Sequence, residues 1–241
     1  MIPNNSYTIL IAQIICHLSL IPLIIYGEPY HYAIAIFVYF INGCLGMTMA
    51  YHRLLTHRSW KCPKIVEYFL SLCATIGLTG SALSWVAIHR EHHAFTDTSK
   101  DPHSPTFKGW FWSHYLSMFA KVKIRYVKDL LSEKFYIYQH KFYFEINLIY
   151  AAVLFFIDPF ALVYAWLVPA ALLWNGGSLI VSSSHRSNGP NNDMIFILTT
   201  WGEGYHKNHH DNARLSRFGK WDLGGFLIEQ YNKYFKTPPV V

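Results

Sequence analysis

The chain has 241 residues and a formal net charge of +6, and only 14% of its residues are charged, against roughly 25% in a typical soluble domain. With 52% hydrophobic and 17% aromatic residues, the composition argues against a soluble globular protein and favours one embedded in a membrane. The length favours a single domain covering residues 1–241. The four cysteines form no Cys-x-x-Cys pair, so we expect buried free thiols.

Four stretches of the sequence are candidates for membrane spans, which need about 20 mostly apolar residues. In chain order they are Tyr7–Tyr26, Tyr32–Tyr51, Phe142–Ile157 and Phe160–Val181. The third is the weakest, because it is short and contains Glu145. Short turns join the first span to the second and the third to the fourth. We therefore predict an all-α integral membrane protein with four transmembrane helices in two hairpins and a helical cap.

A fifth uncharged stretch, Tyr68–Ile88, is also long enough to cross. We expect that it does not, because a crossing would separate two histidine motifs by a hydrocarbon core of about 30 Å. With four crossings, all 20 Lys and Arg residues fall on one side. The positive-inside rule makes that side cytosolic. Both termini and the histidine motifs would then lie in the cytosol.

Histidine is unusually frequent, with 14 residues, and eight of these fall into three short motifs. The motifs are His52 and His57; His89, His92 and His93; and His206, His209 and His210. A spacing of five does not place two side chains on one face of an α-helix. We therefore expect the helix to end or unwind between His52 and His57.

Each His-x-x-His-His motif has spacings of three and four, which place side chains on one helical face. Its two adjacent histidines diverge by about 100°, so they can serve two neighbouring metals. His185 follows the fourth predicted span closely enough to join them. The isolated histidines are expected to have structural roles; these are His17, His31, His114 and His140.

Eight or nine imidazoles exceed the needs of one metal, which takes about four to six ligands, so two metals is the simpler interpretation. Imidazole binds iron, copper, zinc and nickel. Zinc usually recruits cysteine or a carboxylate as well, and no cysteine is placed to help. Two redox-active irons are therefore the preferred hypothesis.

The three motifs and their flanks resemble the histidine boxes of the membrane fatty acid desaturases, the family of stearoyl-CoA desaturases and cyanobacterial acyl-lipid desaturases. The similarity extends from about the second predicted span to near Leu227. It rests on the runs HREHHAFTDTSKDPH (His89–His103), GWFWSH (Gly109–His114) and GEGYHKNHH (Gly202–His210). The resemblance implies a di-iron centre bound by nine histidines: His52, His57, His89, His92, His93, His185, His206, His209 and His210.

The resemblance also implies a reaction in which dioxygen and two external electrons convert a saturated acyl chain to a cis alkene, most often nine carbons from the carboxyl end. The sequence has no haem domain, iron–sulfur cysteine pattern or dinucleotide-binding glycine loop. A ferredoxin or a b-type cytochrome is the expected electron donor, and the basic face suits an acidic donor or anionic lipid rather than nucleic acid.

The expected substrate is an acyl-lipid or an acyl-CoA. The uncharged run Trp85–Ile88, where acyl-CoA members have charged residues, favours an acyl-lipid.

Several other residues are expected to support this centre. Asp97, Asp101 and Glu203 are predicted to form hydrogen bonds to the imidazoles that orient them toward the metal. The family usually has an asparagine at the position of Val181 that holds a water ligand, and we expect the hydroxyl of Ser182 to replace it. Gly43 and Gly46 leave space in the second span, which predicts that a substrate tunnel passes them.

Two other functional classes remain open from the sequence. One is a related histidine-box oxidase, such as a hydroxylase, a ketolase or an alkane monooxygenase. The other is a non-enzymatic metal transporter with histidine-rich loops. Transporters usually place ionisable ligands within their spans, whereas the predicted spans contain only Glu145.

Overall fold

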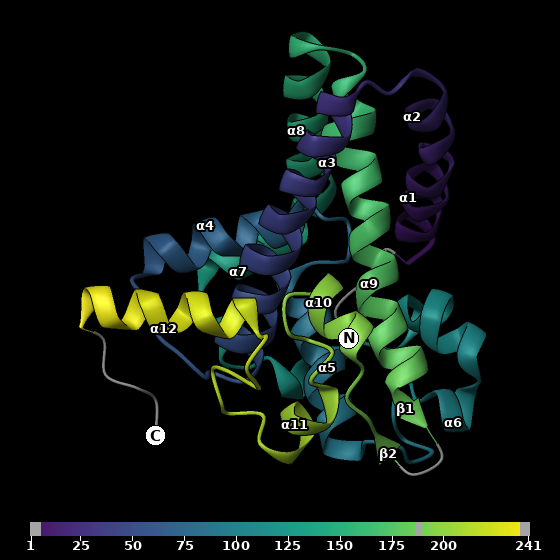
Figure 1. Cartoon of the computed structure of the whole chain (residues 1–241). Helices are drawn as coiled ribbons and strands as arrows, with labels where there is room; N and C mark the ends of the chain where they lie inside the picture. The colour runs from purple at the N-terminus through teal and green to yellow at the C-terminus, as the bar shows by residue number, and fades with distance from the viewer. Residues whose placement is uncertain (1–5, 187–188, 237–241) are drawn as a thin grey trace.

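The structure is a computed structural model that describes residues 6–186 and 189–236. Its helices form an upright group, here called the stem, standing on a broader group, here called the base (Figure 1). The stem contains α1 (Ser6–Leu18), α2 (Leu20–Tyr26), α3 (Pro29–Phe40), a π-helical segment (Ile41–Thr56), α8 (Tyr143–Ile157), a π-helical turn (Val163–Leu167) and α9 (Val168–Ser184).

The base is built mainly from shorter helices, several of which lie across the axis of the stem (Figure 1). Its helices are α4 (Lys64–Thr75), α5 (Ala82–Phe95), α6 (Pro105–Lys108), α7 (Lys134–Lys141), α10 (Met194–Thr199), α11 (His206–Asp211) and α12 (Leu223–Phe235). Four single turns lie at Trp112–Leu116, Ser117–Phe119, Ile124–Tyr126 and Leu130–Ser132. Strands β1 (His185–Arg186) and β2 (Gly189–Pro190) form one short antiparallel pair. The four cysteines are free, as predicted, and three of them are buried.

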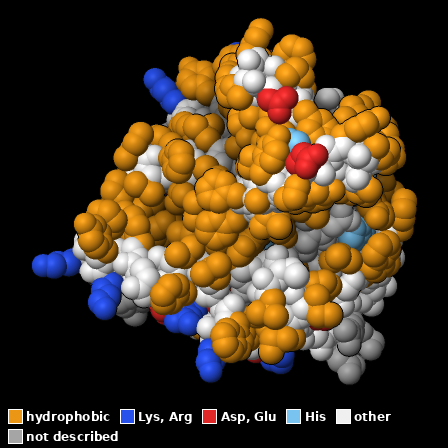
Figure 2. All heavy atoms as spheres, turned by 45° about the horizontal axis from the view of Figure 1, so that its top comes forward, with side chains coloured by type: hydrophobic (Ala, Val, Ile, Leu, Met, Phe, Trp, Pro, Cys, Tyr) orange, Lys and Arg blue, Asp and Glu red, His pale blue; other side chains and the backbone are white. Residues whose placement is uncertain are grey.

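Three helical runs of the stem are long and apolar enough to cross a membrane: Ser6–Tyr26, Pro29–Thr56 and Val163–Ser184. They match the first, second and fourth predicted spans. The third predicted span corresponds to α8, which has 15 residues and is bent by 70° from α7, so it counts as a fourth only if the bent pair forms one span. Large apolar side chains cover much of the face shown in Figure 2. Ile24 and Phe156 are 71% and 85% exposed, which fits a surface solvated by lipid tails.

The stretch Tyr68–Ile88 does not form one helix. It is divided between α4 and α5, with a turn in which Leu78 and Gly80 adopt positive φ angles of 55° and 106°. The side chain of Ser81 then caps α5 by accepting a hydrogen bond from the backbone N–H of Ser84. The turn brings α5 back against the π-helical segment, so the histidines of both elements lie on one side of the stem.

The prediction that the helix ends or unwinds between His52 and His57 is confirmed. The helix ends at Thr56 and is a π-helix, whose turns are wider than those of an α-helix, and the backbone N–H of His57 donates to the carbonyl of His52 at 3.2 Å. A π-helix joins residue i+5 to residue i. Residues five apart therefore lie almost above one another, and the two rings come within 4.9 Å, centroid to centroid.

The π-helical segment packs closely against α4 through Gly46. A Cβ atom on Gly46 would lie 2.4 Å from the backbone nitrogen of Ala74. The prediction that Gly46 borders a substrate tunnel is therefore wrong, because its missing side chain makes room for a helix. Below this contact lies the largest apolar cluster of the base, which includes Tyr51, Trp60 and Leu83.

Replacing Gly46 with alanine should destabilise the fold, because the contacted atoms belong to backbone and cannot rotate away. We expect Gly46→Ala to lower the free energy of unfolding by about 1–3 kcal/mol, measured as a lower midpoint of thermal unfolding in detergent. Gly177→Ala is the matched control, since a Cβ there meets nothing within 4 Å. Equal midpoints for the two variants would contradict the packing argument.

Candidate metal centre

The nine histidines singled out by their sequence motifs and by the position of His185 come together in the base. They form two groups in which the candidate ligand nitrogens all lie within 4.8 Å of one another. The five-histidine group contains His52, His57, His89, His93 and His209, and the four-histidine group contains His92, His185, His206 and His210. Each His-x-x-His-His motif supplies both groups, because its adjacent histidines point to different sides of the helix.

Short distances between Nε2 atoms define both groups. In the five-histidine group, Nε2 of His209 lies 3.1 Å from that of His52 and 2.8 Å from that of His93. In the four-histidine group, the Nε2 atoms of His185 and His206 are 2.7 Å apart. Two nitrogens that bind one first-row metal at about 2.1 Å and at right angles lie about 3 Å apart. The spacing therefore fits shared metal ions.

Carboxylates contact three of the imidazoles at Nδ1, the ring nitrogen that does not face the neighbouring histidines. Nδ1 of His52 lies 2.6 Å from Glu203, Nδ1 of His92 lies 2.8 Å from Asp101, and Nδ1 of His185 lies 2.8 Å from Asp97. The three acidic side chains are thus where the sequence analysis expected them.

These bonds decide which ring nitrogen carries the proton. A carboxylate accepts, so Nδ1 must donate and Nε2 keeps its lone pair. The lone pair of His185 then faces the Nε2 of His206 at 2.7 Å. A proton on Nε2 of His206 or a shared cation would each satisfy this lone pair. Because five nitrogens in one group and four in the other lie within 4.8 Å of one another, the donor set fits a shared metal ion in each group.

Burial favours the neutral form of several of these imidazoles. Burial, followed by the neighbouring imidazoles, lowers the pKa of His93 to about 3 and that of His210 to about 2. At neutral pH their lone pairs are therefore not occupied by protons. Nε2 of His57 is buried without a hydrogen-bond partner among the described residues. Such orphaned atoms are rare unless a water or an ion binds them.

Arg53, which sequence reasoning missed, holds Glu203 in place and is itself held by Asp222. Arg53 is fully buried and donates both to Glu203 and to Asp222, each at 3.0 Å. Burial alone would raise the pKa of Glu203, but His52 and Arg53 outweigh it and hold that pKa below its usual value. Glu203 is therefore an anionic acceptor for His52. The sequence did contain a signal for this role, because Arg53 directly follows His52 at the end of an apolar run, where a charged residue needs a partner.

Ser182 does not take the expected position. Its hydroxyl lies 3.1 Å from Nδ1 of His114, and Nε2 of His114 lies 3.3 Å from the side-chain oxygen of Asn175. Ser182 is thus directed at a histidine outside both groups, and its predicted role as a water holder beside His185 is not supported. Ser184 is also buried, and its hydroxyl has no hydrogen-bond partner among the described residues.

The other isolated histidines form hydrogen-bond contacts away from the two histidine groups. His31 caps α3 by accepting a hydrogen bond from the backbone N–H of Glu28 at 2.9 Å. His17 lies 2.8 Å from the side-chain amide of Asn175, and His140 lies 2.6 Å from the hydroxyl of Ser81. None of them belongs to the two histidine groups.

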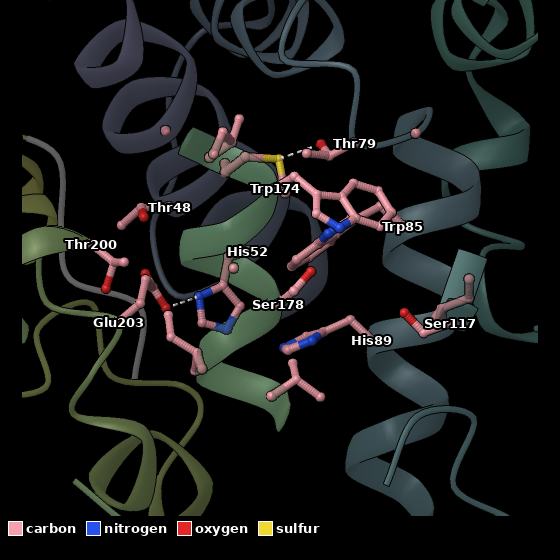
Figure 3. Close-up of a pocket in the computed structure, with 18 of the residues that line it drawn as sticks. Thr48, His52, Thr79, Trp85, His89, Ser117, Trp174, Ser178, Thr200 and Glu203 are labelled. Carbon is pink, nitrogen blue, oxygen red and sulfur yellow. Dashed lines mark hydrogen bonds and ion pairs between the residues drawn. The ribbon is translucent and has the colours of Figure 1, made fainter. Parts of the chain in front are cut away.

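A cavity adjoins both groups, and Figure 3 shows His52 and His89 pointing toward it from different helices, with Glu203 against His52. His206 borders the cavity from the four-histidine group. Most of the remaining wall is apolar or aromatic and includes Trp85 and Trp174. Trp85 stacks on His89 with 4.8 Å between ring centroids, so an apolar ligand in the cavity would lie directly beside the ligand histidines.

Gly43 borders this cavity, but the indole of Trp201 occupies the space beside it. A Cβ atom on Gly43 would lie 2.1 Å from that ring. Trp201 also packs on Tyr39, with 4.5 Å between centroids, and both rings line the cavity. Trp201, which lies far from Gly43 in sequence, is therefore the side chain that limits the cavity at this point.

Comparison with known proteins identifies related sequences over most of the chain. Residues 29–218 match the fatty acid desaturase family. An sn-1 stearoyl-lipid 9-desaturase from Anabaena variabilis is 33% identical over 77% of this chain and 73% of its own length. One of the same name from Synechocystis is 34% identical over 85% and 71%. An icosanoyl-CoA 5-desaturase from Limnanthes douglasii is 33% identical over 76% of this chain and 57% of its own length.

The carboxylate behind His92 should tune metal affinity without being a ligand. Asp101→Asn keeps the shape but removes the charge that holds the Nδ1 proton of His92. We expect at least a tenfold loss of metal affinity, the lower end of what such second-shell changes cost, measured by competition with a chelator. Glu229→Gln, which alters an exposed ion pair with Arg217, is the control. Unchanged affinity in Asp101→Asn would show that the hydrogen bond does not orient the ligand.

Proposed function

The chain belongs to the fatty acid desaturase family and is an oxidoreductase acting on fatty acyl chains, and we propose that it inserts a cis double bond at a di-iron centre. In the proposed reaction, dioxygen, two electrons and two protons remove two hydrogens from adjacent methylenes, giving one alkene and two waters. The whole chain acts as a single desaturase domain. The observation that carries the proposal is the pair of adjacent histidine groups beside one apolar cavity.

The nine histidines of the two groups are the proposed iron ligands. Their all-nitrogen donor set includes none of the four free cysteines, which favours iron over structural zinc. When bound, the irons supply the oxidising power that an unactivated C–H bond requires. The protein orients His52, His92 and His185 through their carboxylates, and the aromatic wall excludes water.

The cavity beside His52, His89 and His206 is the proposed site for the acyl chain. A straight hydrocarbon has no polar group to recognise, so its position depends on the shape of an apolar wall. The two stearoyl-lipid 9-desaturase relatives favour a double bond nine carbons from the carboxyl end of a lipid-linked chain. The uncharged run Trp85–Ile88 in front of His89 also favours an acyl-lipid over an acyl-CoA.

We propose that the stem crosses the membrane four times and that the base is a cytosolic cap. The bent pair α7 and α8 supplies the fourth crossing, with α8 as its apolar part. All 20 Lys and Arg residues then lie on the side of the base, as the positive-inside rule requires of the cytosolic side. Electrons come from a separate donor, a ferredoxin or a b-type cytochrome, which the basic base would attract.

Expression in a host without desaturases tests the function directly. We expect new monounsaturated acyl chains in the lipids of that host, detected by mass spectrometry, and about two irons per purified chain. His93→Ala and His209→Ala should abolish the product and lower the iron content. His140→Ala should change neither, because that histidine lies outside both groups. Hydroxylated chains in place of alkenes would overturn the assignment.

Accessibility of single cysteines tests the sidedness. Thr106 and Glu28 are exposed and lie in the base and in the turn between α2 and α3. In a chain that also carries Cys62→Ser, a cysteine at Thr106 should react with a membrane-impermeant reagent only from the cytosolic side. A cysteine at Glu28 should react only from the opposite side. Labelling of both from the same side would contradict the four-span topology.

A further inference from the structure

His103 is a buried histidine that belongs to neither histidine group. It is 6% exposed and borders the same cavity as His52, His89 and His206. Its ring lies 4.4 Å from that of His92, tilted by 30°. His92, Asp101 and His103 also offer ligand atoms within 4.8 Å of one another. His103 therefore lies beside the four-histidine group.

Asp101 fixes the position of His103 beside the four-histidine group. Its backbone N–H donates to Oδ1 of Asp101 at 3.0 Å, which fixes the residue. Its Nδ1 is buried, lies 3.9 Å from the same oxygen and has no hydrogen-bond partner among the described residues. The charge of Asp101 favours a proton on Nδ1. Nε2 then keeps its lone pair, on a residue that lines the cavity.

The two groups are unequal, with five imidazoles in one and four in the other. A divalent first-row metal takes about four to six ligands, so a metal held by four imidazoles would have room for a water ligand. The cavity wall is apolar at Val181, four residues before His185, and at Ile88. His103 is the neutral polar side chain beside His92 on that wall.

We infer that His103 is a positioning residue whose Nε2 accepts a hydrogen bond from a water ligand at the four-histidine site. His103 is not within 4.8 Å of all members of that group, which favours contact through a water over a direct bond to the metal. Asp101 then orients two histidines, with Oδ2 on the ligand His92 and Oδ1 beside His103. The inference rests on the proposed di-iron function.

Mössbauer spectroscopy of ⁵⁷Fe-loaded protein tests this role separately from activity. The wild-type protein should hold two irons and show two doublets of equal area. In His103→Phe and His103→Leu we expect both irons to remain, one doublet to shift and the other to stay unchanged. His103→Gln, which keeps a polar group, should restore the wild-type spectrum. The turnover number should fall about 10- to 100-fold in the two apolar variants, the usual range for second-shell changes.

The outcomes separate the two levels of the hypothesis. A wild-type protein without two irons would refute the proposed function itself. Two irons in the wild type, with unchanged doublets in His103→Phe and His103→Leu, would refute only the role of His103. Loss of one iron in both apolar variants would also overturn it, because His103 would then be a direct ligand. His114→Phe is the control, a buried histidine outside both groups that should leave both doublets unchanged.

Discussion

The hydrogen bond from a histidine Nδ1 to a carboxylate is the interaction on which the metal centre depends. With Glu203, Asp101 and Asp97 in place, Nδ1 of His52, His92 and His185 carries the proton, and Nε2 of each keeps a lone pair directed toward a neighbouring imidazole. A bound cation would be shared by these buried nitrogens, so metal binding and folding should be thermodynamically linked.

The π-helical segment is the second constraint, because it aligns His52 with His57. Contacts from α5 hold the C-terminal end of the π-helical segment in its widened geometry. Arg90, which follows the candidate ligand His89, donates to the backbone carbonyls of Leu55 and Thr56. Trp60 donates to the carbonyl of Met49 at 2.9 Å. The first histidine motif is therefore held by a residue of the second, and the relative positions of both motifs are fixed together.

The long apolar runs and the histidine spacings were readable from the sequence, because each depends on neighbours along one helix. The widening near His57 was not, since it depends on Arg90 and on the packing of α4. The roles of Gly46 and Ser182 were not readable either. Gly46 lacks a side chain because α4 packs against it, and the hydroxyl of Ser182 contacts His114. In each case the decisive partner lies on another element, so local periodicity carries no information about it.

The distribution of acidic groups compensates for the unequal numbers of imidazoles. Asp97 and Asp101 both contact members of the four-histidine group, whereas Glu203 alone contacts the five-histidine group and shares its charge with Arg53. In a buried site a nearby negative charge stabilises a cation far more than it does in water. The site with fewer ligands thus has the stronger negative field. Two cations with different numbers of nitrogen ligands can therefore be held side by side, each with a distinct electrostatic environment.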